Sequence, residues 1–455
     1  MPRPETFPTS PPTERAYLVG VELKKKPNAF AIEDSMNELE RLAETDGLSV
    51  VGQAIQRVER LNPATMIGKG KLQEIVAERE ELQYDVLIFN DELHPNQQRE
   101  IENAFDGADI KVLDRTALIL DIFAQHARTR EGSLQVELAQ YEYRLPRLTR
   151  MWTHLGRQTG GAAGRGGSGG VGLRGPGERQ LELDRREIRA RIAHLKTEIE
   201  RVRKQRGEQR RKRKREGLPV ISIVGYTNAG KSTLLNALTD SDIYVADQLF
   251  ATLDPTTRRV KLPSGQEVLF SDTVGFIEKL PTQLIAAFRA TLEEIIESNV
   301  LLHVVDITHP NAAEQVSAVE ETLEELGASD KPTVMAFNKL DALPVLPDSE
   351  LHKNNFENGG EGETLGQWMQ EYPDAVAISA RERVGLEALL ERVEQVLGSG
   401  LMDIRVQIPY NATELVNTFH RKGIVESEDY SPRGTLIQGK IPQALAREFE
   451  MYRVE

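Results

Sequence analysis

Residues 225 to 232 combine glycines, a lysine and hydroxyl side chains at the spacing of a phosphate-binding loop. The segment Gly225-Tyr-Thr-Asn-Ala-Gly-Lys-Ser232 fits the pattern G-x-x-x-x-G-K-[ST]. In this pattern glycines let backbone N–H groups close around phosphate oxygens, the lysine neutralises the outer phosphates, and the serine hydroxyl reaches a magnesium ion. The segment therefore predicts a phosphate-binding loop.

Three shorter motifs follow this loop in order along the chain. Asp272-Thr-Val-Gly275 offers a carboxylate for magnesium, through water, and the Gly275 N–H for a γ-phosphate. Asn338-Lys-Leu-Asp341 offers an aspartate that can accept from both the N1 proton and the 2-amino group of guanine, and Ser379-Ala380 offers an N–H for the guanine O6. Each motif alone is common at a strand end or turn. The four in order predict a GTP site.

Each of these motifs follows a short apolar run that is typical of a buried strand. The four runs are Val220–Val224, Glu267–Ser271, Thr333–Phe337 and Ala375–Ile378. The segment that continues from the phosphate-binding loop, Thr233–Leu238, is typical of a helix. We therefore expect the motifs at the ends of strands within one domain, residues 217–400.

Residues 16–130 predict a second α/β domain upstream. The segments Tyr17–Leu23, Leu48–Val51, Asp85–Phe89 and Ile110–Leu113 are typical of strands, and Ser35–Glu44 and Lys69–Leu82 of helices. Strands separated by helices indicate right-handed βαβ units and a parallel sheet. Within this domain Gly68-Lys-Gly-Lys71 has two readings, a simple helix start or a phosphate site at a helix N-terminus.

Residues 131–216 predict a helical hairpin. Two sets of apolar residues recur at the three- and four-residue spacing of a coiled-coil seam, and Pro146 should end or kink the first helix. The first set is Leu134, Leu138, Tyr141, Leu145 and Leu148, and the second is Leu181, Ile188, Ile192, Leu195, Ile199 and Val202.

Two positively charged segments of this hairpin suggest contact with RNA. Between the helices, residues 156–177 are rich in glycine and arginine, and Arg157, Arg165, Arg174 and Arg179 could order on phosphates. The second helix ends with the run Arg210–Arg215. The alternatives are a flexible linker and a solvated helix end.

The composition is that of a multidomain protein without disulfides. The chain has 455 residues, no cysteine and a formal net charge of −14, so nucleic-acid binding would depend on local basic segments. No segment approaches the roughly 20 uninterrupted apolar residues of a membrane span, and residues 1–15 predict a disordered tail. We expect a cytoplasmic monomer, with peripheral membrane association left open.

Four segments together resemble the HflX GTPases. They are Pro63–Lys71, Gly164–Gly170, Gly175–Asp184 and Phe250–Thr256, and the resemblance covers about residues 15 to 400. It implies an N-terminal α/β domain, a helical hairpin and a Ras-like GTPase domain that act together on ribosomes. Members of the family bind the large ribosomal subunit and its RNA and are implicated in splitting stalled ribosomes. An ATP-dependent activity has been attributed to their N-terminal domain.

The resemblance also assigns roles to single residues. It implies that Ser232 and Thr252 bind magnesium directly, that Asp272 holds it through water, and that Lys231, Thr252 and Gly275 serve catalysis. Phe276 stands where many GTPases place a water-orienting glutamine, so intrinsic hydrolysis should be slow. Asn228 is the residue type of potassium-stimulated GTPases, with a structural turn as the alternative. The full predicted set of nucleotide contacts is Gly225, Tyr226, Thr227, Asn228, Ala229, Gly230, Lys231, Ser232, Thr233, Phe250, Ala251, Thr252, Leu253, Asp254, Asp272, Thr273, Val274, Gly275, Asn338, Lys339, Leu340, Asp341, Ser379 and Ala380.

Two segments depart from the family pattern. Pro344–Glu371 is polar and glycine-rich and predicts an exposed insertion, and residues 401–455 predict a small α+β appendage with a helix over Ala412–Lys422. The function we predict is that of a ribosome-associated factor that hydrolyses GTP. Two alternatives stay open at this point: a GTP switch that binds a protein partner through the hairpin, and an RNA-remodelling ATPase that GTP regulates.

Overall fold

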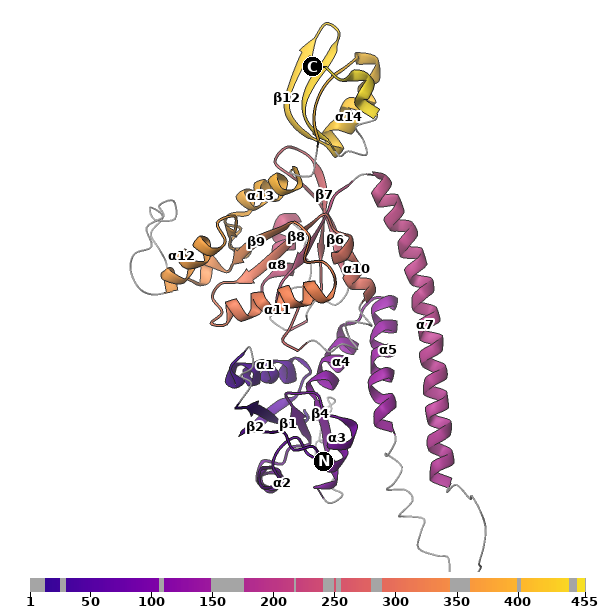
Figure 1. Ribbon diagram of the computed structural model, residues 1–455, viewed down its shortest axis with the longest axis vertical. Coiled ribbons are helices and arrows are strands. Elements are labelled where there is room, and N and C mark those ends of the chain that lie inside the picture. Colours follow the sequence, from indigo (N-terminus) through magenta and orange to yellow (C-terminus); the bar gives the residue numbers. More distant parts are fainter. Residues whose placement is uncertain are drawn as a thin grey trace, which may run out of the picture. The chain divides into compact units, whose positions relative to one another are not determined.

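A computed structural model describes residues 13–24, 30–105, 110–148, 176–216, 218–239, 249–250, 255–279, 289–343, 361–398, 402–441 and 448–454. The chain divides into two compact units, with the boundary within a long helix, between Val202 and Arg203. Most of the predicted tail and the glycine- and arginine-rich loop lie outside the described residues. Figure 1 labels the elements.

The first unit begins with a four-stranded parallel sheet in the order β2-β1-β3-β4. The strands are β1 (Arg15–Leu23), β2 (Ser49–Val58), β3 (Val86–Phe89) and β4 (Lys111–Asp114), and the helices are α1 (Ile32–Thr45), α2 (Lys69–Leu82), α3 (Pro95–Asn103) and α4 (Arg115–His126). The α/β domain with a parallel sheet is confirmed. Strand β2 is longer than expected, because the polar residues Gln53 and Gln56 do not interrupt it.

Two further helices, α5 (Arg130–Arg147) and α7 (Pro176–Glu216), run side by side (Figure 1). Arg130 pairs with Glu198 and Arg191 with Glu137, so the two helices are antiparallel. Leu138 and Leu195 of the predicted seam are buried. Helix α5 ends directly after Pro146, as expected.

The second unit contains a six-stranded sheet in the order β10-β9-β8-β5-β7-β6, in which only β6 is antiparallel to its neighbour. Its strands are β5 (Val220–Val224), β6 (Thr256–Lys261), β7 (Glu267–Asp272), β8 (Val300–Asp306), β9 (Thr333–Asn338) and β10 (Val376–Ala377). Its helical segments are α8 (Lys231–Thr239), α10 (Arg289–Glu297), α11 (Ala312–Glu325), η2 (Leu340–Ala342), α12 (Glu361–Glu371) and α13 (Leu386–Gly398). The four motif-bearing strands are neighbours of one another or of β8, which brings their carboxyl ends to one edge.

The prediction that Pro344–Glu371 forms an exposed insertion is wrong for its second part. Residues 361–371 form helix α12, and its Leu365 and Trp368 are buried beside Phe337 of the sheet. The error arose because the polar composition of the whole segment hid two apolar residues at helical spacing. Residues 344–360 lie outside the described residues.

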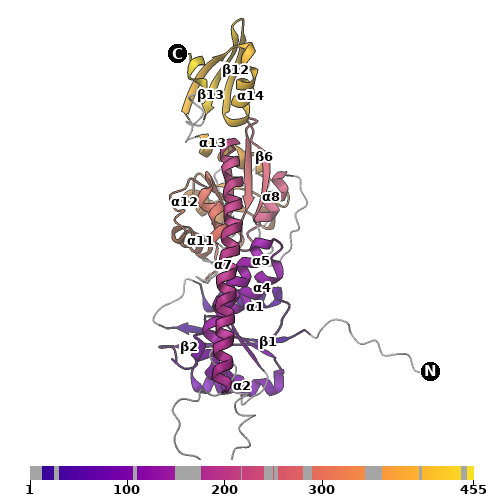
Figure 2. The same ribbon diagram turned by 90° about the vertical axis from the view of Figure 1, so that its right-hand side faces the viewer.

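The appendage is a three-stranded antiparallel sheet in the order β11-β13-β12, with helix α14 on one face (Figure 2). The elements are β11 (Met402–Ile408), η3 (Tyr410–Ala412), α14 (Thr413–Lys422), β12 (Ile424–Ser431), β13 (Gly434–Ile441) and η4 (Glu450–Tyr452). Phe419 of α14 packs on the inward residues Ile404, Val406 and Ile437. The predicted α+β appendage is confirmed. Among the described helices none is long and apolar enough to cross a membrane.

Candidate nucleotide-binding site

The predicted phosphate-binding loop connects β5 to α8. Gly230 has φ +95°, and a Cβ there would come within 2.2 Å of the Asn338 Nδ2. A side chain is therefore excluded at this position by backbone strain and by space. Asn228 is exposed at the tip of the loop with φ 59°, a conformation that asparagine tolerates better than most residues.

Lys231 is buried at the start of α8, with its ammonium group over the loop. Its Nζ donates to the backbone carbonyls of Tyr226, at 2.6 Å, and Gly225, at 3.1 Å. Burial lowers the pKa of Lys231 to about 8, against the opposing attraction of Asp272. The lysine is thus a desolvated cation, which makes it a strong partner for phosphate oxygens.

Ser232, in the first turn of α8, meets Asp272 at the end of β7. The Ser232 hydroxyl donates to the Asp272 Oδ2 at 2.6 Å, and Asp272 is fully buried at the end of β7. A hydroxyl and a carboxylate side by side form the hard oxygen donor set that magnesium prefers. These residues therefore fit the predicted metal site.

The segment after Asp272 lies against the phosphate-binding loop. Thr273 donates its hydroxyl to the Ile223 carbonyl at 2.6 Å, so its side chain holds two strands together. Phe276 forms a backbone bridge with Tyr226, and the residue is 1% exposed. The position where many GTPases orient water is therefore a buried apolar group.

The two guanine motifs are tied to the phosphate-binding loop by one buried asparagine. Asn338 donates to the Ala229 carbonyl at 2.8 Å and accepts from the Ala380 N–H at 2.9 Å. Ser379 donates its hydroxyl to the Asp341 Oδ1 at 2.6 Å, while Asp341 itself is exposed. The bonds of Asn338 thus bring together the phosphate-binding loop and the two guanine motifs. The Ser232–Asp272 bond adds the fourth motif, Asp272–Gly275.

Part of the predicted site is not described. Phe250 is buried, and Ala251, Thr252, Leu253 and Asp254 lie outside the described residues. Two residues next to the site were not predicted. Asp306 ends β8 and pairs with Lys339 at 2.7 Å, and a polar residue that closes an apolar strand beside the motifs was the available signal. His303 is buried in β8, and burial together with Lys231 lowers its pKa to about 4.

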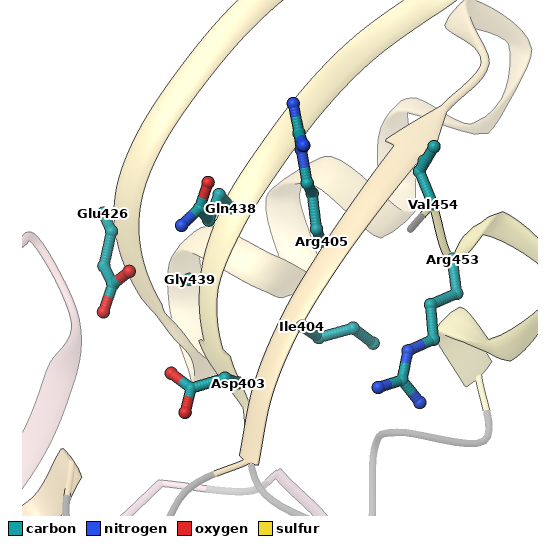
Figure 3. Close-up of a pocket in the computed structure, with 8 residues that line it drawn as sticks. All are labelled: Asp403, Ile404, Arg405, Glu426, Gln438, Gly439, Arg453 and Val454. Carbon is teal, nitrogen blue, oxygen red and sulfur yellow. The ribbon is translucent and has the colours of Figure 1, made fainter.

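Two other places in the chain were considered as ligand sites, and neither has the converging groups of the nucleotide site. At the start of α2, the Gly68 N–H donates to Gln56 and Lys71 pairs with Glu74, so the helix start is satisfied within the domain. A concavity of about 760 Å³ lies on the appendage. Figure 3 shows Arg405 and Arg453 at its border pointing away from each other, so the two guanidinium groups do not converge on a common ligand position.

The fold and this arrangement define a GTPase of the phosphate-loop class. Residues 33–124, 126–213 and 220–339 match three family models, described as GTP-binding GTPase N-terminal, GTP-binding GTPase Middle Region and 50S ribosome-binding GTPase. The chain is 44% identical to the GTPase HflX of Caldanaerobacter subterraneus subsp. tengcongensis, over 94% of this chain and 91% of that protein. It is 38% identical to the GTPase HflX of Escherichia coli, over 90% of each. The chain belongs to the HflX GTPase family.

Proposed function

We propose that this GTPase acts on ribosomes, binding the large subunit and its RNA and helping to split or rescue stalled ribosomes. The observation that carries the proposal is the match of residues 220–339 to the family model described as a 50S ribosome-binding GTPase. The hairpin supports it, because α7 carries exposed cations, among them Arg189, Arg203 and Lys204. Such cations provide the electrostatic contribution of RNA binding. The protein would act in the cytoplasm.

Within the site, Lys231 and the Gly275 N–H would bind the γ-phosphate and stabilise charge on the transferring group, and Asp341 would select guanine. Magnesium would be held by Ser232, by Asp272 through water and by Thr252, and it would neutralise phosphate charge. The Ser232 and Asp272 side chains support this assignment, because their oxygens lie 2.6 Å apart. Only a γ-phosphate would distinguish the GTP-bound from the GDP-bound state.

Sedimentation with purified ribosomes tests the proposal. We expect the protein to sediment with the large subunit in the presence of a nonhydrolysable GTP analogue and to remain in the supernatant with GDP. Binding should weaken steeply as salt rises, because phosphate contacts release counterions. Equal sedimentation with both nucleotides, or binding that salt does not change, would contradict it.

Two cofactor assignments remain hypotheses. The first is that Asn228, at the loop tip, binds potassium. Equal rates of GTP hydrolysis in sodium chloride and potassium chloride would contradict this role and show that Asn228 only forms the turn.

The second is that ATP binds and is hydrolysed at the N-terminal domain. The full chain carrying Lys231→Ala would then still hydrolyse ATP, and absence of this turnover would rule the hypothesis out.

A further inference from the structure

An ion pair joins the guanine motif Asn338–Asp341 to the end of the neighbouring strand. The Lys339 Nζ lies 2.7 Å from the Asp306 Oδ2. Asp306 is the last residue of β8 and Asn338 the last residue of β9, and the two are partners in the parallel ladder. The pair therefore lies at the carboxyl edge of the sheet, beside the asparagine that ties this motif to the phosphate-binding loop.

The carboxylate of Asp306 is held in place by Thr308. Its Oδ1 accepts from the Thr308 hydroxyl at 2.6 Å and from the Thr308 N–H at 3.1 Å. The Asp306 side chain is 12% exposed, and the Lys339 side chain is 30% exposed. Because Thr308 binds one carboxylate oxygen, the other oxygen offers the lysine ammonium a fixed position.

The order of the strands places this pair between the two ends of the nucleotide site. In the sheet order β10-β9-β8-β5, the phosphate-binding loop follows β5, whereas Asp341 and Ser379 follow β9 and β10. A nucleotide with its phosphates at Lys231 and its base at Asp341 must therefore cross the carboxyl end of β8. The Lys339 side chain reaches from β9 to this position, because its ammonium group pairs with Asp306.

We propose that Asp306 is a positioning residue for guanine nucleotides: it holds the Lys339 side chain at the carboxyl end of β8, where the methylene stem forms one wall of the site. This inference rests on the proposed roles of Lys231 and Asp341. A lysine stem without a partner samples many rotamers, and ordering it on binding costs affinity. Asp306 orders the stem in the free protein. It therefore strengthens the binding of GTP, GDP and GMP by the same factor, since all three share the base and the ribose.

The test is Asp306→Asn, which keeps the size of the side chain. The amide oxygen can retain both bonds from Thr308, which leaves an NH2 group facing the Lys339 ammonium, so that two donors meet without an acceptor. The dissociation constants of GDP, GMP and a nonhydrolysable GTP analogue should each rise about fivefold. In turnover, the KM for GTP should rise by the same factor with kcat unchanged, because the stem would contact the substrate equally before and during the reaction.

A double-mutant cycle with Lys339→Met separates positioning from a purely structural role. Methionine keeps an unbranched apolar stem and lacks the ammonium group, so Asp306 no longer has a charge to hold. In this background Asp306→Asn should change none of the three affinities. An equal loss in both backgrounds would show that Asp306 acts through Thr308 alone and would overturn the proposal. A loss for GDP and the GTP analogue without a loss for GMP would also contradict it, because the effect would then concern the phosphates.

Glu267→Gln is the matched control. Glu267 begins β7 of the same sheet, at the opposite end of the strand from Asp272, and pairs with Arg259 at 3.0 Å through a side chain that is 21% exposed. This change likewise removes one ion pair of a partly buried carboxylate, and it should leave the three affinities unchanged. Unchanged affinities in Asp306→Asn would show that the positioning role is wrong. Normal GDP affinity in Lys231→Ala would instead show that the assignment of the nucleotide site itself fails.

Discussion

At the scale of single residues, burial controls the chemistry of the nucleotide site. Lys231 is desolvated beneath the loop, which lowers its pKa to about 8, and its neighbour His303 is neutral because burial and the lysine lower its pKa to about 4. Asp272 is the buried group that opposes the shift of Lys231. A phosphate placed on the lysine adds a second negative partner and should return its pKa toward the ordinary value.

This lysine predicts a pH dependence for nucleotide binding. Above pH 8 the free protein loses the proton of Lys231, whereas the complex keeps it, so binding must take up a proton and weakens as pH rises. A lysine with a pKa near 8 predicts that GDP affinity falls about fourfold between pH 7 and pH 8.5. Titration with a fluorescent GDP derivative at constant ionic strength measures this change.

The matched comparison is GMP, which shares the base and ribose but lacks the outer phosphate that the lysine would contact. Its affinity, measured by competition, should stay constant over the same range. Parallel pH profiles for GDP and GMP would show that Lys231 does not carry the effect.

At the scale of elements, two types of contact join α5 and α7: ion pairs, which are weak, and a buried apolar seam, which is strong. Arg191 and Glu137 form an ion pair between exposed and half-exposed side chains, and such pairs contribute about 0–1 kcal/mol. Leu195 is fully buried, and removing a buried leucine side chain costs about 2–5 kcal/mol. The apolar seam, more than the ion pairs, should hold the helices together.

We therefore expect Leu195→Ala to lower the free energy of unfolding of the N-terminal unit by about 2–4 kcal/mol, because it leaves a cavity in the seam. Arg191→Gln, about one helical turn before Leu195, should lower it by less than about 1 kcal/mol. Urea unfolding followed by circular dichroism compares the two variants. Equal losses would mean that the ion pairs carry the hairpin.

The same elements show what a sequence can predict. Local patterns were sufficient to place the predicted motifs at the ends of β5, β7, β9 and β10 and to predict the βαβ order, because each depends on residue types at short fixed spacing. They were not sufficient for the bond between Tyr226 and Glu278, nor for the pair of Asp306 and Lys339, because these contacts join segments far apart in the chain. Helix α12 was missed since its packing against Phe337 is a tertiary contact.

At the scale of the whole molecule, the charge distribution decides how a protein with a net charge of −14 could bind RNA. An acidic surface repels nucleic acid on average, so affinity must come from local basic segments. The glycine- and arginine-rich loop between α5 and α7 offers cations and almost no apolar side chains. Any affinity that it contributes must therefore come from phosphate contacts and counterion release.

Replacing arginines of this loop by glutamine needs a control variant that loses the same number of positive charges at positions outside the hairpin. Four exposed arginines outside the hairpin can be replaced by glutamine to give the same loss of positive charge, and this variant should bind ribosomes like the unchanged protein. They are Arg41, Arg60, Arg381 and Arg433.

Replacing the four loop arginines, Arg157, Arg165, Arg174 and Arg179, by glutamine should weaken ribosome binding. The slope of log affinity against log salt should flatten by about 0.7 to 0.9 for each phosphate contact that is lost, which sedimentation at several salt concentrations measures. Basal GTP hydrolysis should stay unchanged, because these residues lie outside the nucleotide motifs, while stimulation by ribosomes should fall. Unchanged affinity and slope would mean that the loop is only a linker, and the RNA contact would then have to come from Arg210–Arg215 or from the N-terminal domain.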